Sequence, residues 1–342
     1  MHGPTPSGPR PSRRALLRGA AGGGLALTGL AAAAPGANAT ARAPGAPGAR
    51  AIGAKVRDLT GPAQTGRFGA PWTDLGIPAR CPDGSMLLVC GDTFDGGGVG
   101  GPDWRSPVGL RSSNADPAAL TVDGCVGGGR AVGLVPEGHE GGTTAIPSDV
   151  FTVGSTMYMH LMRGVIYRTH HSDFWRSDDN GETWQYLCQW PVFNRDITSG
   201  LLLHRVRQDA LGNPAAYEPW GYAGGAWAWG NPPTTVTAAR RWGEICFRAM
   251  DGGYALSWLN MAPLDLRAQF FPLPTSHLFT TPEQTTIIPT VPGRESGNAV
   301  AGPYGGFIVP GSTVGDLHLA VSQWYDAQNY RVMQYRVSGL SR

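Results

Sequence analysis

The sequence SDDNGETW occupies residues 177–184 and fits the pattern S-x-D-x-G-x-x-W. The side chains of Ser177 and Asp179 can bond the amides of a turn, and Gly181 can adopt the positive φ that such a turn requires. Trp184 then supplies a large ring that can pack between two sheets. The segment predicts a tight turn between two strands in which Asp179 is structural, because the spaced acids and closing Glu of a calcium loop are missing.

From residue 56 onward, the chain consists of short apolar or alternating runs separated by Gly and Pro, as strands joined by turns would be. Polar and apolar residues alternate in 316–324 and 330–337, whereas the wholly apolar run 86–89 is typical of a strand buried on both faces. Helical periodicity is almost absent, because Pro and Gly interrupt every candidate. This pattern predicts an all-β sandwich, barrel or propeller. The strands expected are 85–89, 150–153, 156–162, 163–170, 244–250, 254–259, 306–309, 317–324 and 330–337.

The turn sequence at 177–184 resembles the Asp-box hairpin that recurs in sialidase-like β-propellers, and this favours a propeller among the all-β folds. At about four strands per blade, the chain after its first 54 residues has room for five blades. We expect the last strand, residues 330–337, to complete the blade that begins near residue 56, which would close the ring and hide the sheet edges. The predicted fold class is therefore an all-β, five-bladed β-propeller.

The first 50 residues differ from the rest in charge. They carry six of the 27 basic residues and none of the 25 acidic ones. The remainder is therefore mildly acidic and has no electrostatic footprint for nucleic acid.

The N-terminal sequence SRRALLR, residues 12–18, has the twin-arginine pattern and precedes a weakly apolar, Gly/Ala-rich segment. An A-x-A cleavage site ends at Ala39. We predict a twin-arginine signal peptide at 1–39, a flexible leader at 40–54 and the propeller catalytic domain at 55–342. The alternative is an uncleaved anchor, but the run is too short and too weakly apolar to span a membrane well. A secreted or cell-envelope location without stable membrane insertion follows.

Two aspartates occupy apolar, aromatic settings. Asp92 follows the apolar run 86–89 and Gly91, while Asp74 lies in the sequence PWTDLG, residues 71–76. A carboxylate at the end of a buried strand costs free energy unless it is paired or functional. Two acids on successive strands could converge on one pocket. The alternative is that each caps a turn, as Asp beside Gly often does.

Aromatic residues and further acids extend this hypothesis. Most of the 11 Trp residues should be packing residues, but those in Gly-rich contexts are candidates for stacking on sugar rings. Two further acids, one directly before a strand-like run, lie in similar settings. Acids with exposed aromatics fit glycoside hydrolysis, which needs two carboxyl groups that flank the scissile bond. The candidates for substrate binding are Trp72, Trp104, Trp220, Asp149 and Glu218.

Signals for metals, nucleotides or a serine nucleophile are weak or missing. The Gly-rich segment 95–101 is followed by Pro102 rather than by a helix, and G-K-[ST] is missing. His139 and Glu140 do not begin H-E-x-x-H, since Thr143 stands at the second His position, and G-x-S-x-G does not occur. The sequence lacks C-x-x-C, and its five cysteines leave at least one unpaired in an exported monomer. We therefore expect no cofactor and no metal ion.

Five segments together resemble one actinobacterial family, which was long a domain of unknown function and now includes endo-D-arabinanases. They are PWTDLG at 71–76, GDTF at 91–94, YGGFIVPGS at 304–312, VSQW at 321–324 and YRVM at 330–333, and the resemblance covers nearly all of the chain after the leader. It implies a five-bladed propeller with a catalytic aspartate pair near its axis.

By position in these motifs, the resemblance assigns the catalytic pair to Asp74 and Asp92. We favour Asp92 as the general acid with Asp74 as its partner, and inversion as the stereochemical outcome. Tyr304, which begins the third motif, is a candidate substrate contact. The expected substrate is a polysaccharide with α-D-arabinofuranosyl linkages, as in arabinogalactan or lipoarabinomannan.

Two other functions remain open at this point. One is a non-catalytic carbohydrate-binding propeller of the cell envelope, which would bind glycan without cutting it. The other is a propeller glycosidase of different specificity, for L-arabinan or a sialidase-like substrate. A sialidase needs an arginine cluster and a Tyr nucleophile, and no spacing in the sequence groups its arginines in that way.

Overall fold

The computed structural model describes residues 52–136, 144–165, 168–190, 200–237, 242–276 and 283–340. The expected signal peptide, most of the leader and the His139-Glu140 pair lie outside these residues. Within them the fold is all-β, as predicted, and the α-helical structure is the four-residue helix α2 (Pro62–Thr65). No helix in the described segments is long and apolar enough to cross a membrane.

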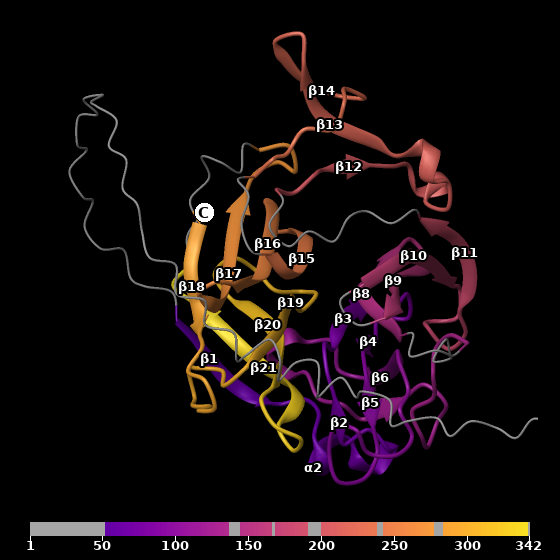
Figure 1. Cartoon of the computed structure of the whole chain (residues 1–342), viewed down its shortest axis with the longest axis vertical. Coiled ribbons are helices and arrows are strands. Elements are labelled where there is room, and N and C mark those ends of the chain that lie inside the picture. The colour runs from indigo at the N-terminus through magenta and orange to yellow at the C-terminus, as the bar shows by residue number, and fades with distance from the viewer. Residues whose placement is uncertain are drawn as a thin grey trace, which may run out of the picture. The chain divides into compact units, whose positions relative to one another are not determined.

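In the described residues, five antiparallel sheets of three or four strands follow one another in sequence order. Figure 1 shows them succeeding one another around a common centre. In order, the sheets contain β3 (Ile77–Arg80), β4 (Met86–Cys90), β6 (Val108–Ser112) and β7 (Gly124–Cys125); β8 (Thr144–Val153), β9 (Thr156–Val165), β10 (Arg168–Ser177) and β11 (Gln185–Trp190); β12 (His204–Arg205), β13 (Glu218–Ala223) and β14 (Ala226–Trp229); β15 (Trp242–Met250), β16 (Gly253–Met261), β17 (Leu264–Phe271) and β18 (Glu283–Pro289); β19 (Pro303–Ile308), β20 (Leu317–Trp324), β21 (Tyr330–Ser338) and β1 (Ile52–Asp58).

The last sheet joins the two ends of the described chain. Strand β1 pairs with β21 in antiparallel register from Ile52 opposite Ser338 to Asp58 opposite Met333. The predicted pairing of the last strand with the segment near residue 56 is therefore confirmed. It hides one edge of β21, which would otherwise present unpaired amides and carbonyls.

The first strands of the fourth and fifth sheets run in the same direction. A Cβ built on Gly305, near the start of β19, would lie 3.4 Å from the Cβ of Glu244, near the start of β15. Further along both strands, the amide of Ile308 donates to Sγ of Cys246 at 3.4 Å. Because the contacts advance together along both strands, the beginnings of β15 and β19 lie at the same end of the molecule.

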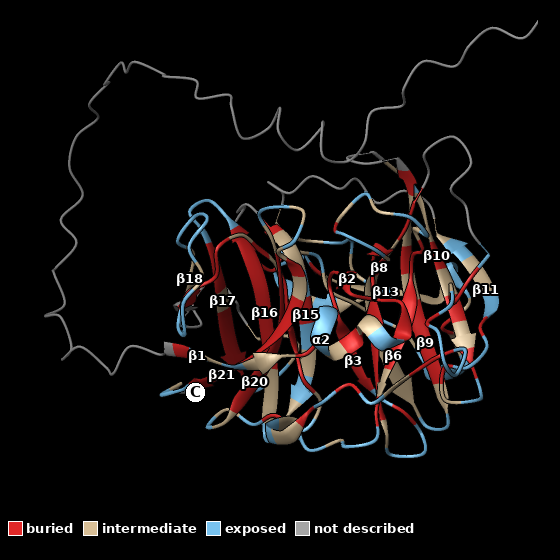
Figure 2. Ribbon diagram, turned by 90° about the horizontal axis from the view of Figure 1, so that it is seen from below, coloured by how far each residue is buried: buried red, intermediate tan, exposed pale blue. Residues whose placement is uncertain are grey.

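The core lies between the sheets rather than within any one of them. Strand β4 is buried over its whole length, and in β20 only the final Trp324 is partly exposed, whereas β11 at a sheet edge is largely exposed. Figure 2 shows the same contrast between buried strands and exposed connecting loops. The largest cluster of buried side chains draws on all the four-stranded sheets, so these sheets stabilise one another by burial of apolar surface.

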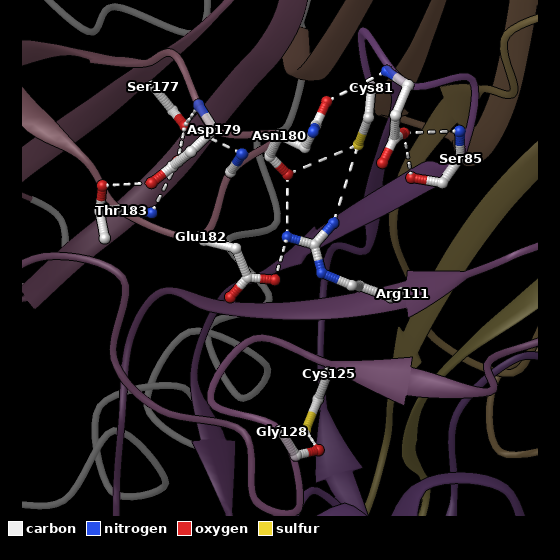
Figure 3. A network of polar contacts seen from close by, with 12 residues as sticks. Cys81, Ser85, Arg111, Cys125, Gly128, Ser177, Asp179, Asn180, Glu182 and Thr183 are labelled. Carbon is white, nitrogen blue, oxygen red and sulfur yellow. Dashed lines mark hydrogen bonds and ion pairs between the residues drawn. The ribbon is translucent and has the colours of Figure 1, made fainter.

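The turn predicted at 177–184 forms between β10 and β11, and Figure 3 shows the polar contacts of its residues. Oγ of Ser177 accepts from the amide of Gly181 at 2.9 Å, and Oδ1 of Asp179 accepts from the amide of Thr183 at 2.9 Å. Gly181 has φ of 82°, and the buried ring of Trp184 donates from Nε1 to the carbonyl of Gly181 at 3.1 Å. The structural role predicted for Asp179 is thus confirmed.

This turn also fastens the second sheet to the first. Arg111 on β6 donates from Nη2 to the carbonyl of Asn180 at 2.8 Å and forms an ion pair with Glu182 at 2.7 Å. The amide of Asp83, in the turn between β3 and β4, donates to Oδ1 of Asn180 at 3.1 Å. Figure 3 shows Arg111 reaching across from its strand to the turn.

The structure corrects one strand prediction and leaves the cysteines unbridged. Residues 163–170 do not form a strand of their own, since β9 ends at Val165 and β10 begins at Arg168. Turn residues do not mark the boundary in the sequence, because residues 156–177 contain no Pro and their one Gly, Gly164, lies within β9. All five cysteines are free, and four of them are buried: Cys81, Cys90, Cys125 and Cys246.

Candidate active site

A two-stranded ribbon brings Asp74 and Asp92 together. Strand β2 (Trp72–Thr73) pairs with β5 (Thr93–Phe94) in antiparallel register, with Thr73 opposite Thr93. The hydroxyls of these two threonines are hydrogen-bonded at 2.6 Å. Asp74 follows the first threonine and Asp92 precedes the second, so both aspartates lie at the same end of the ribbon. The amide of Gly91 donates to the carbonyl of Asp74 at 3.1 Å, which continues the pairing beyond the ribbon.

Both aspartates are enclosed. The exposed fraction is 1% for Asp74 and 3% for Asp92. Oδ1 of Asp74 lies 2.2 Å from the position that a Cβ on Gly91 would take. The side chain of Asp74 therefore packs directly against the backbone that carries Asp92, and residue 91 can only be glycine if this approach is kept.

The carboxyl of Asp92 is held by two donors. Nε1 of Trp104 donates to Oδ1 of Asp92 at 3.0 Å, and Oγ1 of Thr144 donates to the same oxygen at 3.4 Å. Thr144 is the first residue of β8, and near the other end of that strand Thr152 donates to the carbonyl of Arg80, the last residue of β3, at 2.6 Å. The first and second sheets therefore run side by side, and their beginnings meet at the aspartate pair.

An aromatic cluster lies beside the pair. Trp72, Phe94 and Tyr330 form its buried centre, and Trp104 and Trp324 pack against them. The ring of Trp104 stacks on Phe94 with centroids 6.3 Å apart and planes 15° apart. Of the residues predicted to stack on sugar rings, the structure thus places Trp104 in contact with Asp92 and Trp72 in the buried centre of the adjoining cluster. Trp72 also donates from Nε1 to the carbonyl of Gly96 at 2.6 Å.

The Gly-rich segment 95–101 covers part of this cluster and is held in place. The amide of Val99 donates to the carbonyl of Ala327 at 2.9 Å, and a Cβ built on Gly98 would lie 2.4 Å from that same carbonyl oxygen. Asp95 forms an ion pair with Arg130 at 3.0 Å. The segment packs closely against the 325–329 loop and begins no helix, in agreement with the sequence-based rejection of a phosphate loop.

Asp149 lies further along β8 and bridges two sheets. Its carboxyl accepts both terminal nitrogens of Arg248 on β15, at 2.9 and 2.5 Å. This bidentate ion pair joins the second and fourth sheets. Asp149 therefore shares its strand with Thr144 but lies five positions beyond it, and the contact that it makes is structural.

The remaining candidates lie on other sheets. Glu218 on β13 is exposed and forms an ion pair with Arg205 at 2.7 Å. Trp220 on the same strand packs against Trp227 and Trp229, with ring centroids 6.1 and 5.1 Å away. Both residues thus belong to the third sheet, whereas the aspartate pair belongs to the ribbon beside the first. Tyr304, the second residue of β19, is half-buried against the main core.

Sequence reasoning missed Thr144 and the requirement for glycine at position 91. A threonine at the start of a strand carries no distinctive signal. The close approach of Asp74 to Gly91 joins two separate segments, and their spacing in the sequence does not reveal it. In the described part of the chain, no group of three or more His, Cys, Asp or Glu residues could hold a metal ion. The arrangement instead offers two enclosed carboxyl groups beside aromatic rings.

The model of the family named "domain of unknown function (DUF4185)" matches residues 60–197 and 186–336. An uncharacterized 35.9 kDa protein of Mycolicibacterium smegmatis is 27% identical over 331 residues, which cover 81% of this chain and 95% of that protein. Notoamide biosynthesis cluster protein J of an Aspergillus strain is 27% identical over 318 residues, 77% of this chain and 82% of that protein.

Among solved structures, a candidate hydrolase of Bacteroides ovatus superposes with a TM-score of 0.55 at 12% identity, over 80% of this chain and 87% of its own. At that identity the likeness concerns the fold alone. The two family matches together span nearly all of the described residues. The chain therefore belongs to the DUF4185 family.

Proposed function

We propose that this protein is a glycoside hydrolase in which Asp74 and Asp92 are the catalytic carboxyl pair. The observation that supports the proposal is the β2–β5 ribbon, which brings two aspartates from separate strands to one end. Both are enclosed, and Trp104, which packs against the aromatic cluster, donates to Asp92. Enclosed carboxyls next to aromatic rings suit a reaction that needs one protonated acid and one base or nucleophile.

The two carboxyls would divide the work as follows. Asp92 donates a proton to the leaving glycosidic oxygen, and Asp74 acts from the other side of the bond as base or nucleophile. A protonated carboxyl keeps one acceptor oxygen, so the donors at Oδ1 of Asp92 are compatible with a proton on Oδ2. The buried rings of the aromatic cluster would exclude water from one side of the pair.

The five sheets would be the blades of a β-propeller, since they follow in order and the last is completed by β1. The motif resemblance to endo-D-arabinanases favours α-D-arabinofuranosyl linkages in mycobacterial-type arabinan as the substrate. Export by the twin-arginine route would bring the enzyme to that polysaccharide, which lies in the cell envelope.

The test is to incubate the purified protein with mycobacterial arabinogalactan and to measure new reducing ends and released oligosaccharides. We expect release by the wild type and none by Asp74→Asn or Asp92→Asn. Asp209→Asn is the matched control, because Asp209 is an exposed partner of Arg207 outside the site. Binding of arabinan without any new reducing ends would favour the carbohydrate-binding alternative and contradict the proposal.

A further inference from the structure

Two hydrogen-bond donors from different parts of the fold meet on one oxygen of Asp92. Trp104 comes from the loop between β5 and β6, and Thr144 begins the second sheet. Their distances to Oδ1 are 3.0 and 3.4 Å. A single donor lets a carboxyl rotate about it, whereas two donors from separate segments fix both the position and the orientation of the group.

Both donors are themselves held by contacts that do not involve Asp92. The backbone next to Trp104 is bridged to β5, where Thr93 and Arg105 exchange hydrogen bonds of 2.9 and 3.0 Å. The buried guanidinium of Arg105 donates to the carbonyls of Ala131 and Gly69, and these bonds anchor the segment that carries Trp104. The indole ring of Trp104 is additionally stacked on Phe94. Its N–H group is therefore oriented before any substrate arrives.

Thr144 is equally constrained. It is 4% exposed, and its backbone pairs with Gly164 of β9. Its hydroxyl reaches Asp92 from the second sheet, whereas the indole reaches the carboxyl from the loop that leads into β6 of the first sheet. The orientation of Asp92 therefore depends on how these two sheets are packed against each other.

We propose that Trp104 and Thr144 are positioning residues, which keep Oδ1 of Asp92 as an acceptor so that its transferable proton resides on Oδ2. This inference rests on the proposed function, in which Asp92 protonates the leaving oxygen. It gives Trp104 a different part from the sugar platform that the sequence suggested, since its N–H group serves the carboxyl. Misplacement of a reacting group by about 1 Å can cost about 100-fold in rate, so loss of one donor should affect kcat.

The first experiment uses variants that remove a donor and keep the shape. Trp104→Phe keeps a ring to stack on Phe94 but lacks N–H, and Thr144→Val keeps the volume but lacks the hydroxyl. We expect each to lower kcat on arabinan by about 10- to 100-fold with KM changed less than threefold. Thr144→Ser restores a hydroxyl and should recover most of kcat. Equal activity of Thr144→Val and Thr144→Ser would overturn the role of Thr144.

A matched control separates this effect from general loss of tryptophan packing. Trp175 on β10 is a buried core residue of the second sheet. Trp175→Phe makes the same chemical change outside the site and should leave kcat and KM unchanged. If Trp104→Phe retained the kcat of the wild type, or if it raised KM alone as loss of a sugar platform would, the positioning role of Trp104 would be wrong.

A second measurement needs no substrate and so distinguishes the two proposals. Aspartate labelled with 13C at Cγ gives a carboxyl NMR signal for Asp92, assigned with Asp92→Asn. We expect this signal to move in Trp104→Phe and Thr144→Val and to stay near its wild-type position in Thr144→Ser and Trp175→Phe. If the Asp92 signal moves in these variants but the protein cleaves no glycan, the positioning role of Trp104 and Thr144 is supported and the proposed function is contradicted. An Asp92 signal that is unchanged in Trp104→Phe contradicts the positioning role of Trp104, whether or not the protein cleaves arabinan.

Discussion

Oδ1 of Asp74 lies 2.2 Å from the point where a Cβ at residue 91 would stand, so Gly91 and Asp74 occupy adjoining space. The methyl group of Leu75 would lie 3.0 Å from the same point. The glycine is thus needed for its lack of a side chain, and its φ does not lie in the left-handed region. This close approach is what sets the two aspartates beside each other.

Gly91→Ala should therefore displace Asp74 and damage both stability and activity. Overpacking of this kind costs about 1–3 kcal/mol of unfolding free energy. Urea denaturation and the rate of arabinan cleavage check the two effects. Gly97→Ala is the control, because a Cβ there would have no atom within 4 Å. Wild-type activity in Gly91→Ala would mean that the position of Asp74 is not important for the reaction.

Asp179→Ala should weaken the fold and spare the chemistry. The carboxyl of Asp179 accepts from Ser177 at 2.7 Å and from the amide and hydroxyl of Thr183 at 2.9 and 2.6 Å. Loss of these bonds should cost about 1 kcal/mol, since the site is open to water. Thermal unfolding measures that cost, while kcat at a temperature well below the midpoint should equal that of the wild type. A loss of kcat in the folded variant would show that the turn contributes to the site.

Glu295 stabilises the closure between the two ends of the chain. It accepts from Lys55 on β1 at 2.5 Å, from Gln323 on β20 at 2.6 Å, and pairs with Arg331 on β21. Glu295→Gln should lower the free energy of unfolding by about 1–3 kcal/mol, because the partly buried Lys55 and Arg331 lose one carboxylate partner and keep their pairing with Asp58 at 2.7 and 3.1 Å.

Arg207→Gln is the control for this change, since the Arg207–Asp209 pair is exposed and should contribute little. Chemical denaturation of both variants at low and at high salt gives the comparison. Equal stability of the two variants would indicate that the Glu295 network does not hold β1 on the sheet.

His318 should make the fold sensitive to mild acid. Its side chain is 1% exposed, and Nδ1 is hydrogen-bonded to Nε2 of Gln334 at 3.0 Å. Burial lowers the pKa of His318, although the carboxylate of Asp316 acts in the opposite direction. The unfolded chain thus binds this proton more readily than the folded one. The stabilisation is complete above about pH 6.5, the ordinary value for His, and is lost as pH falls toward the lowered pKa.

His318→Gln removes this titration. We expect the unfolding free energy of the variant to fall less than that of the wild type between pH 7 and pH 5, as measured by urea denaturation. His160 and His204, whose pKa values burial also lowers, remain in both proteins and cancel in the comparison. Parallel pH dependence in the two proteins would contradict this role of His318.

The local signals of the sequence predicted local structure well. The turn at 177–184 formed as expected because its hydrogen bonds join residues at most four apart. Strand 317–324 was predicted with its observed bounds because polar and apolar residues alternate along it and Gly315 precedes it. The strands at the third sheet were missed, since Gly and Trp in residues 218–229 hide any alternation.

The site required information that local patterns do not contain. The sequence singled out Asp74 and Asp92 because acids next to buried runs are costly. It could not reveal that Thr144, 52 positions away, donates to Asp92, or that Arg248, 99 positions from Asp149, neutralises that acid. Such contacts depend on how the sheets pack. The same holds for Trp104, whose indole N–H group serves Asp92.

The claim that Asp74 and Asp92 act as one catalytic pair is tested most directly by the kcat/KM of each single Asn variant and of the double variant on arabinogalactan. Groups that act as a unit give non-additive losses. We predict that each single change lowers kcat/KM by at least about 1,000-fold and that the double variant is no worse than the single ones. Wild-type cleavage by either folded single variant would contradict the account.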